Sequence, residues 1–283
     1  MKKTFVFVCF ILVGCAVLKP NTQTPERLMT VSDYLVTNTR VVSASSTPSF
    51  IPSPEPSATI SPSSAEELPI CSPLEGVSLE KLPDRVVNSY HPPDPGSDDP
   101  HHGVDLAEIL PETKIAIAGL PVHAVLTGTV AGVIHDRFPY GNALIVETQL
   151  YDFPQGSQFL RLLPTPAPTL EAIPILTCPD VPNLSIGNPD RYSLYLLYAH
   201  LQSSPTFEIG ESIQCGETIG VIGSSGNALN PHLHLETRLG PKGSRFLSMA
   251  HYDNSATPEE MATYCLWRVS GLFQMIDPLR LLK

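Results

Sequence analysis

Residues 68–283 are predicted to fold as one mainly β domain, an antiparallel β-sheet with one or two short helices near the C-terminus. Two observations lead to this prediction. Short segments rich in Val, Ile, Leu and Tyr alternate with Gly, Asn and Ser turn signals, as in β-sheet domains. Near the end, Thr257-Pro258-Glu259-Glu260 offers an N-cap, a first-turn proline and a capping-box glutamate, which predict the start of a helix.

The strands are expected in a regular order along the chain. Residues 122–126 and 129–134 flank Thr127-Gly128, which is a hairpin signal. A Tyr140-Gly141 turn precedes the next strand, and a loop rich in Gly, Ser and Asn separates the last two. The strands after the hairpin are expected at residues 142–150, 192–201, 218–222 and 232–238.

Residues 151–191 interrupt this pattern with a long insertion. It contains Pro164, Pro166, Pro168 and Pro174, which exclude regular secondary structure. Long irregular segments are usually either functional or disordered. The insertion is therefore either a surface flap or one wall of a substrate cleft.

The N-terminus is predicted to be a targeting segment. Lys2 and Lys3 precede an apolar run at residues 4–13 that is too short to span a bilayer. The run ends in Leu12-Val13-Gly14-Cys15, which resembles the lipobox of a bacterial lipoprotein. The resemblance implies a signal peptide at residues 1–14 and a lipid on Cys15; an ordinary signal peptide with a chance cysteine is the alternative.

Residues 15–67 are expected to be a disordered tether. Ser, Thr and Pro dominate this stretch, and such a composition cannot bury enough apolar surface to fold. A tether of this kind would let the domain leave an outer-surface or periplasmic membrane and reach a polymer. The net charge of −11 disfavours binding to nucleic acid, because an acidic chain repels phosphate.

Four cysteines follow Cys15, namely Cys71, Cys178, Cys215 and Cys265. An even number in an exported chain favours two disulfides, with three pairings open. We expect Cys71–Cys265 and Cys178–Cys215, because the first closes a long loop and restricts the unfolded chain most. A zinc site built from four thiolates is the alternative, although no CxxC pair is present.

Three histidine motifs carry the chemistry. His101-His102-Gly103-Val104-Asp105 places a His and an Asp four residues apart, and the glycine indicates a loop. Tyr198-Ala199-His200-Leu201 ends a predicted strand. In Pro231-His232-Leu233-His234-Leu235-Glu236 the two histidines are two residues apart, so on a strand they face one cleft. His102 is expected to point away from its neighbour His101.

The ordered set is more specific than each motif alone. HxGxD, a hairpin, Tyr-Gly-Asn, a strand ending in YAHL, a Gly-rich loop and PHLHLE together resemble the lysostaphin/LytM family of zinc endopeptidases. The similarity extends over about residues 101–281. The insertion at residues 151–191 departs from the family pattern, which puts substrate preference in doubt.

This resemblance implies a LytM-type domain, a duplicated hybrid motif, that holds one Zn²⁺. His101, Asp105 and His234 become its ligands, and His200 and His232 become the catalytic histidines. Two imidazoles and one carboxylate leave a fourth position for water, as in catalytic zinc sites. Zinc would make the water acidic and polarise a carbonyl, while the histidines move protons.

The implied function is a zinc endopeptidase that cuts peptide bonds in peptidoglycan cross-links or stem peptides. A non-catalytic cell-wall binding or hydrolase-activator lipoprotein of the same fold is an alternative, although such relatives typically lack ligands and this chain keeps all of them. A zinc peptidase that acts on an extracellular protein is a third possibility.

Overall fold

The structure is a computed structural model that describes residues 69–92, 98, 101–150, 176–181, 184 and 186–283. All of them belong to one unit of the chain, Ile60–Lys283. The predicted signal peptide and tether, and residues 151–175 of the insertion, lie outside this part, so those predictions stay open. Within the described part, no helix combines the length and the apolar character needed to cross a membrane.

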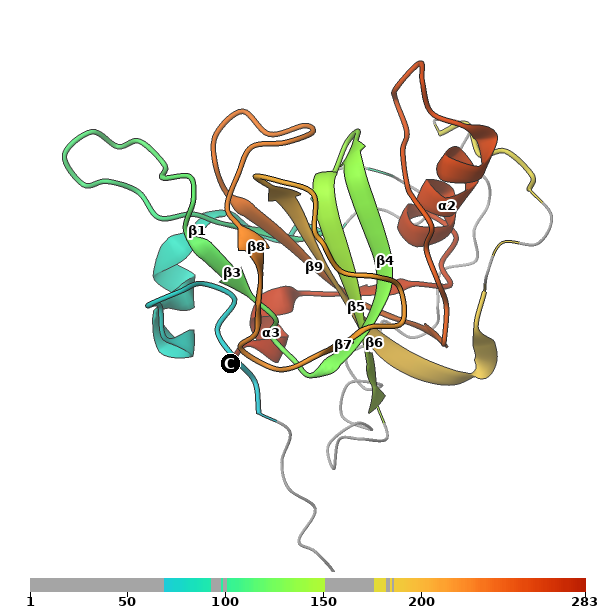
Figure 1. The fold of residues 1–283 in the computed structure, drawn as a ribbon, viewed down its shortest axis with the longest axis horizontal. Coiled ribbons are helices and arrows are strands. Elements are labelled where there is room, and N and C mark those ends of the chain that lie inside the picture. Colours follow the sequence, from blue (N-terminus) through green and yellow to red (C-terminus); the bar gives the residue numbers. More distant parts are fainter. Residues whose placement is uncertain (1–68, 93–97, 99–100, 151–175, 182–183, 185) are drawn as a thin grey trace, which may run out of the picture. The chain divides into compact units, whose positions relative to one another are not determined.

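The predicted antiparallel architecture is confirmed. An eight-stranded sheet has the order β1-β2-β9-β6-β5-β4-β7, with β10 paired to β9, and a second sheet pairs β3 with β8 (Figure 1). The large sheet consists of β1 (Val86–Asn88), β2 (Val104–Leu106), β4 (Gly128–Arg137), β5 (Gly141–Gln149), β6 (Asn188–Leu201), β7 (Ser212–Ile213), β9 (Leu233–Lys242) and β10 (Gln274–Ile276). The small sheet consists of β3 (Pro121–His123) and β8 (Thr218–Val221).

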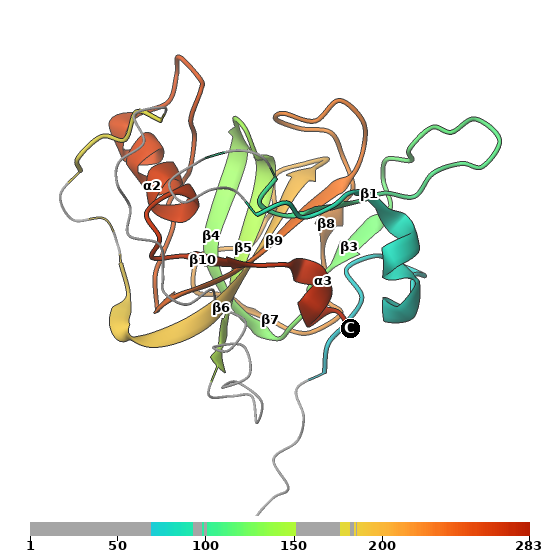
Figure 2. The ribbon, with the colours of Figure 1, turned by 180° about the vertical axis from the view of Figure 1, so that it is seen from behind.

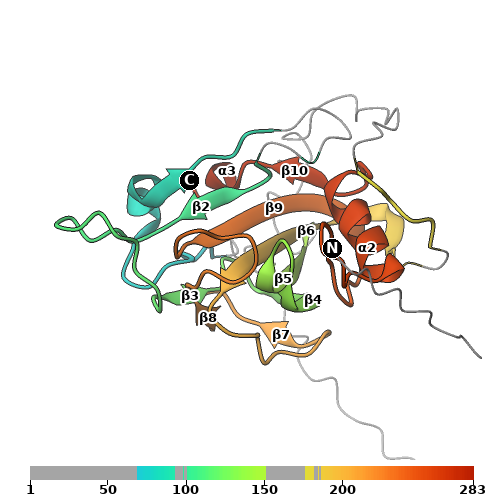
Figure 3. The same cartoon turned by 90° about the horizontal axis from the view of Figure 1, so that it is seen from above.

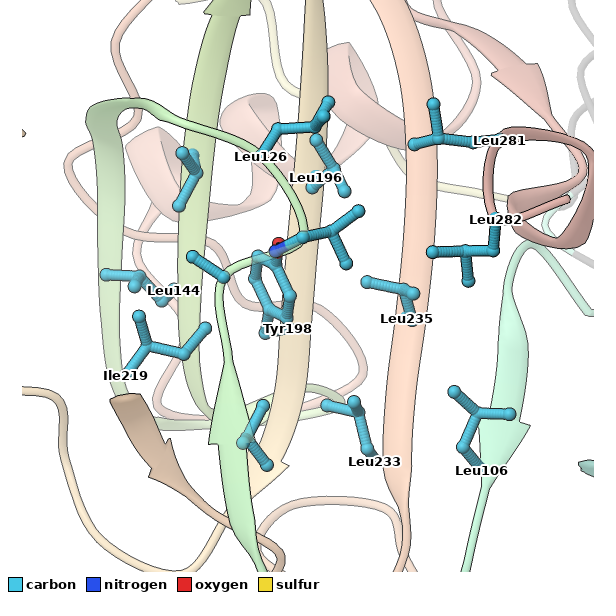
Figure 4. Packing of buried hydrophobic residues seen from close by; sticks show 14 of the residues in the cluster. Leu106, Leu126, Leu144, Leu196, Tyr198, Ile219, Leu233, Leu235, Leu281 and Leu282 are labelled. Atoms are coloured by element: carbon cyan, nitrogen blue, oxygen red, sulfur yellow. The ribbon is translucent and has the colours of Figure 1, made fainter. Parts of the chain in front are cut away.

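Period-2 alternation buries both faces of the large sheet, because successive side chains of a strand point to opposite faces. On β6, Leu194, Leu196 and Tyr198 join one hydrophobic cluster, whereas Tyr195, Leu197 and Ala199 join a second one. The first cluster also contains Leu106 of β2 and both leucines of the HLHL motif on β9 (Figure 4). The leucines of that motif therefore anchor the strand in the core and leave its histidines to the other face.

Helix α2 (Pro258–Arg268) covers part of the second cluster, to which it contributes Tyr264, Leu266 and Trp267. Its capping box is present as predicted: the Glu260 amide donates to Thr257 Oγ1 at 3.2 Å, and the Thr257 amide donates to Glu260 Oε2 at 3.0 Å. The chain then returns along β9 as β10 and continues into α3 (Pro278–Leu281) (Figure 2). The 3₁₀ helix η2 (Leu79–Arg85) was not predicted from the sequence.

The hairpin predicted around Thr127-Gly128 is wrong. β3 pairs with β8 of the small sheet, whereas β4 pairs with β5 and β7 of the large one. The segment between them bonds to other parts of the chain: the Ala124 amide donates to Glu217 O, and Val125 O accepts from the Cys71 amide. The chain therefore crosses from one sheet to the other at this point instead of turning back on itself.

The predicted disulfide pairing is also wrong. The structure joins Cys71 to Cys215 and Cys178 to Cys265, with Cα–Cα distances of 5.6 and 5.8 Å. The Cys71 amide donates to Val125 O, and the Gly216 amide donates to the neighbouring Ala124 O. These two hydrogen bonds place Cys71 beside the turn before β8 that contains Cys215. Cys178 lies beside Cys265 of α2, because Thr177 O accepts a 2.8 Å hydrogen bond from His251 Nε2 in the loop before this helix. The segments that these hydrogen bonds bring together determine the pairing, and loop length does not.

We expect non-reducing peptide mapping of the purified protein to recover Cys71–Cys215 and Cys178–Cys265. The bridges span 144 and 87 residues. In the chain-entropy model, each disulfide contributes about 5 kcal/mol to the free energy of unfolding. Reduction of both disulfides should therefore lower the unfolding temperature strongly. Free thiols at these positions, or a Cys71–Cys265 peptide, would contradict the structure.

Candidate metal centre and active site

Three neighbouring strands position the five residues singled out from the sequence. β9 lies between β2 and β6 (Figure 3), and the register places both Asp105 of β2 and Ala199 of β6 opposite His234. His200 follows Ala199 directly, and His232 precedes β9 in a bridge to Gly223. His101 bridges to His91 just before β2. Strand pairing thus brings together residues that are more than 130 positions apart in the chain, as the 133-residue separation of His101 and His234 shows.

His101, Asp105 and His234 converge on one point. Asp105 Oδ1 lies 3.0 Å from His101 Nε2 and 2.8 Å from His234 Nδ1, and the two nitrogens are 3.2 Å apart. One potential ligand atom from each of the three residues lies within 4.8 Å of the other two. Such an arrangement of two imidazole nitrogens and one carboxylate oxygen can hold a metal ion.

The remaining polar atoms of these three side chains are already engaged elsewhere. His101 Nδ1 donates to Ser89 O at 2.9 Å, and His234 Nε2 donates to Glu236 Oε1 at 3.2 Å. Asn88 Nδ2 donates to Asp105 Oδ2 at 3.1 Å. Each side chain is thereby fixed with its other donor atom directed to the shared point, as is usual for metal ligands. The donor set fits zinc and leaves a fourth position open.

His200 and His232 lie next to this cluster and are oriented in the same way. Their Nδ1 atoms donate to backbone oxygens of Ser225 and Asn230, both at 2.8 Å, so each Nε2 stays available to the site. Their ring centroids are 4.8 Å apart, and His232 Nε2 lies 3.6 Å from Asp105 Oδ1. The pair can therefore exchange protons with a reactant near the cluster.

His200 adopts a backbone conformation that is unusual for a residue with a side chain. Its φ is 62°, in the left-handed region, which only a few per cent of non-glycine residues adopt and which is enriched at functional sites. The surrounding structure holds it there, because the His200 amide donates to Tyr140 O and its ring donates to Ser225 O. The end of β6 is thus bent to present this imidazole.

Burial and hydrogen bonding shift the pKa values of three residues at the site. Burial, together with the nearby His234 and His232, lowers the pKa of His200 to about 3, so this ring is neutral near pH 7. Burial opposes the charge of Asp105, but hydrogen bonds from His101 and His234 hold its pKa below the ordinary value. For His234, burial is outweighed by its bonds to Asp105 and Glu236, which raise its pKa to about 9.

The five residues line a cavity of about 610 Å³. Helix α2 and the loop before it also line the cavity, where Asp98 accepts hydrogen bonds from Tyr252 at 2.8 Å, Tyr264 at 2.9 Å and Arg268 at 2.6 Å. The other lining residues are Asn88, Phe138, Pro139, Tyr140 and Asn227. The described end of the insertion reaches α2 through Cys178 but does not line the cavity.

Sequence reasoning missed a group of buried polar residues behind the site. Glu236 and Arg238 are 0% exposed, and Arg238 Nη2 donates to His102 Nδ1 at 2.8 Å. Burial opposes the charge of Glu236, but Arg238, the hydrogen bond from His234, and Arg268 keep its pKa well below the ordinary value. The sequence pattern that could have predicted this group lies on β9, where His234, Glu236 and Arg238 alternate with core residues.

Comparison with known proteins finds no matching family model. Among solved structures, the chain is similar to the catalytic domain of the antimicrobial peptidase lysostaphin from Staphylococcus simulans, with 18% identity and a TM-score of 0.37 over 72% of this chain and 97% of that one. It is also similar to a mutant catalytic domain of the prophage-encoded M23 protein EnpA from Enterococcus faecalis, with 20% identity and a TM-score of 0.32 over 57% and 86% of the two chains.

A third similar structure is a zinc containing peptidase from Vibrio cholerae, with 20% identity and a TM-score of 0.30 over 54% of this chain and 33% of that one. The identities and TM-scores are low. We therefore base the function of this chain on the geometry of its own site.

Proposed function

We propose that the chain is a zinc-dependent endopeptidase that hydrolyses peptide bonds in peptidoglycan cross-links or stem peptides. The observation that carries this proposal is the constellation of five residues in one cavity. Three of them offer metal ligands within 4.8 Å of one another, and the other two direct free imidazole nitrogens to the same place. One Zn²⁺ ion fits the donor set of His101, Asp105 and His234.

The proposed chemistry divides between the ion and the side chains. When bound, zinc lowers the pKa of a water molecule to near neutrality and polarises the scissile carbonyl. His200 and His232 each bind a backbone oxygen through Nδ1 and direct Nε2 toward the cluster, so one of them can take the proton from the water. The other can donate a hydrogen bond to the tetrahedral oxyanion and a proton to the leaving amine.

Peptidoglycan as the substrate rests on the sequence motifs that resemble the lysostaphin/LytM family and on the predicted export and tether. The test is incubation of the purified chain with sacculi, with and without a chelator, followed by mass spectrometry of the released fragments. New amino termini at peptide bonds, suppressed by the chelator and restored by zinc, support the proposal. A protein that binds zinc but releases no fragments would contradict peptidoglycan as the substrate.

We further propose that the protein is exported and anchored to a membrane through lipid on Cys15. The support is the lipobox at Leu12-Val13-Gly14-Cys15 and the positively charged start of the chain. Replacement of Cys15 by serine is expected to move the protein from the membrane fraction to the soluble exported fraction, because several acyl chains on one residue are needed for stable anchoring. Unchanged membrane partitioning of the Cys15→Ser variant would refute the anchor.

A further inference from the structure

Glu236 lies two residues after His234 on β9, on the same face of the strand. Its side chain is completely buried. A buried carboxylate is costly unless it is paired and hydrogen-bonded, so its presence directly behind the cluster needs an explanation. The proposed chemistry assigns no proton transfer to this residue.

Five side chains donate hydrogen bonds to this one carboxylate. Oε1 accepts from His234 Nε2 at 3.2 Å, Tyr140 OH at 2.7 Å and Arg268 Nη1 at 3.0 Å. Oε2 accepts from Arg238, through Nε at 2.8 Å and Nη2 at 2.7 Å, and from Trp267 Nε1 at 2.9 Å. The carboxylate therefore has no freedom to rotate away from the histidine.

Two of the five donors come from helix α2, which is far from His234 in the sequence. Trp267 and Arg268 end this helix, and Arg238 Nη1 also donates to Trp267 O at 2.5 Å. The end of α2 is thereby fixed against the same carboxylate that contacts the histidine. The guanidinium of Arg238 also packs over the ring of Trp267, with its central carbon 4.8 Å from the ring centroid.

We propose that Glu236 is a positioning residue of the metal centre, and that helix α2 completes this centre by holding Glu236 through Trp267 and Arg268. The inference rests on the proposed zinc site. A carboxylate that accepts from one imidazole nitrogen fixes the ring orientation and makes the other nitrogen a better ligand. For His234 this directs Nδ1 to the point it shares with His101 and Asp105.

The competing explanation is that Glu236 only stabilises the fold as a buried ion pair. Glu147 on β5 provides a matched control, because it is also a buried strand glutamate, 3% exposed. It accepts hydrogen bonds from Arg245 Nη1 at 2.6 Å, Tyr195 OH at 3.2 Å and the Gly243 amide at 2.6 Å. Like Glu236 it is bound by an arginine and a tyrosine, but none of these three hydrogen bonds comes from a histidine.

The test compares zinc affinity in the full-length wild type, Glu236→Gln and Glu147→Gln, by competition with a chromophoric chelator. Glu236→Gln is expected to bind zinc about 10–100-fold more weakly, the usual effect of losing a carboxylate partner of a ligating histidine. The visible spectrum of the Co(II)-loaded protein should shift as well. Glu147→Gln should keep the wild-type affinity and spectrum while its unfolding temperature falls.

Trp267→Phe serves if Glu236→Gln does not fold, because it removes one donor to the carboxylate and retains an aromatic ring. Its zinc affinity should fall by about 10-fold, the lower end of the range for such partners. Wild-type affinity in folded Glu236→Gln or Trp267→Phe, or an equal loss in Glu147→Gln, overturns the inference and leaves the proposed function intact. A wild type that binds no zinc overturns both.

Discussion

Replacing His234 by alanine is expected to abolish both zinc binding and hydrolysis. The change leaves only His101 and Asp105 as protein donors, which are too few for a stable zinc site. His234 also lies at the centre of the cluster, with Nδ1 2.8 Å from Asp105 Oδ1 and Nε2 3.2 Å from Glu236 Oε1. Elemental analysis of the purified variant should find far less than one equivalent of zinc.

The matched control is His135→Ala, which removes an exposed histidine from β4 outside the cavity. This variant should keep zinc and activity. Circular dichroism of both variants would establish that they are folded. Near-stoichiometric zinc in folded His234→Ala would show that this residue is not a ligand.

Replacing His200 or His232 by alanine is expected to give the opposite combination, a protein that retains about one zinc ion but has lost activity. Neither residue belongs to the group whose ligand atoms converge within 4.8 Å. Each instead directs Nε2 into the cavity, with Nδ1 bound to a backbone oxygen. Groups that transfer or orient a proton typically contribute ~10²–10⁴-fold to the rate, or roughly 3–5 kcal/mol of barrier.

The measurement is zinc content and hydrolysis rate on the same preparations. His232 is the sharper case, because its Nε2 lies 3.6 Å from Asp105 Oδ1, close to the cluster. Full activity of His232→Ala, or loss of its zinc as in His234→Ala, would refute the division of roles within the HLH motif. If the wild type does not hydrolyse peptidoglycan, neither variant can differ from it, and the proposed function is refuted.

The sequence predicted those parts of the fold that short-range patterns control. The long apolar run of β6 and the alternation of His and Leu at the start of β9 are visible in the residues, and the capping box at Thr257 locates the start of α2 because its hydrogen bonds are local. Period 2 likewise predicts that His232 and His234 share a face. The structure brings them together with His101, Asp105 and His200, which the order of the motifs suggested.

Long-range pairing could not be predicted in the same way. Thr127-Gly128 resembles a hairpin turn, but hydrogen bonds of the neighbouring residues to Glu217 and Cys71 direct the chain to another sheet. The cysteine pairing depends on which backbone segments become neighbours, so loop length was a poor guide. Arg268 was missed because a charged residue on a helix usually faces solvent, and its partner Glu236 is brought to it only by folding.

The central claim is that one zinc ion at His101, Asp105 and His234 makes this chain a peptidase. The most direct test is to strip the purified protein of metal, return zinc in measured steps, and follow the release of new amino groups from sacculi. Activity is expected to be absent without zinc, to rise with added metal and to saturate at one equivalent. Hydrolysis by the stripped protein, or no hydrolysis at one bound equivalent, would contradict the claim.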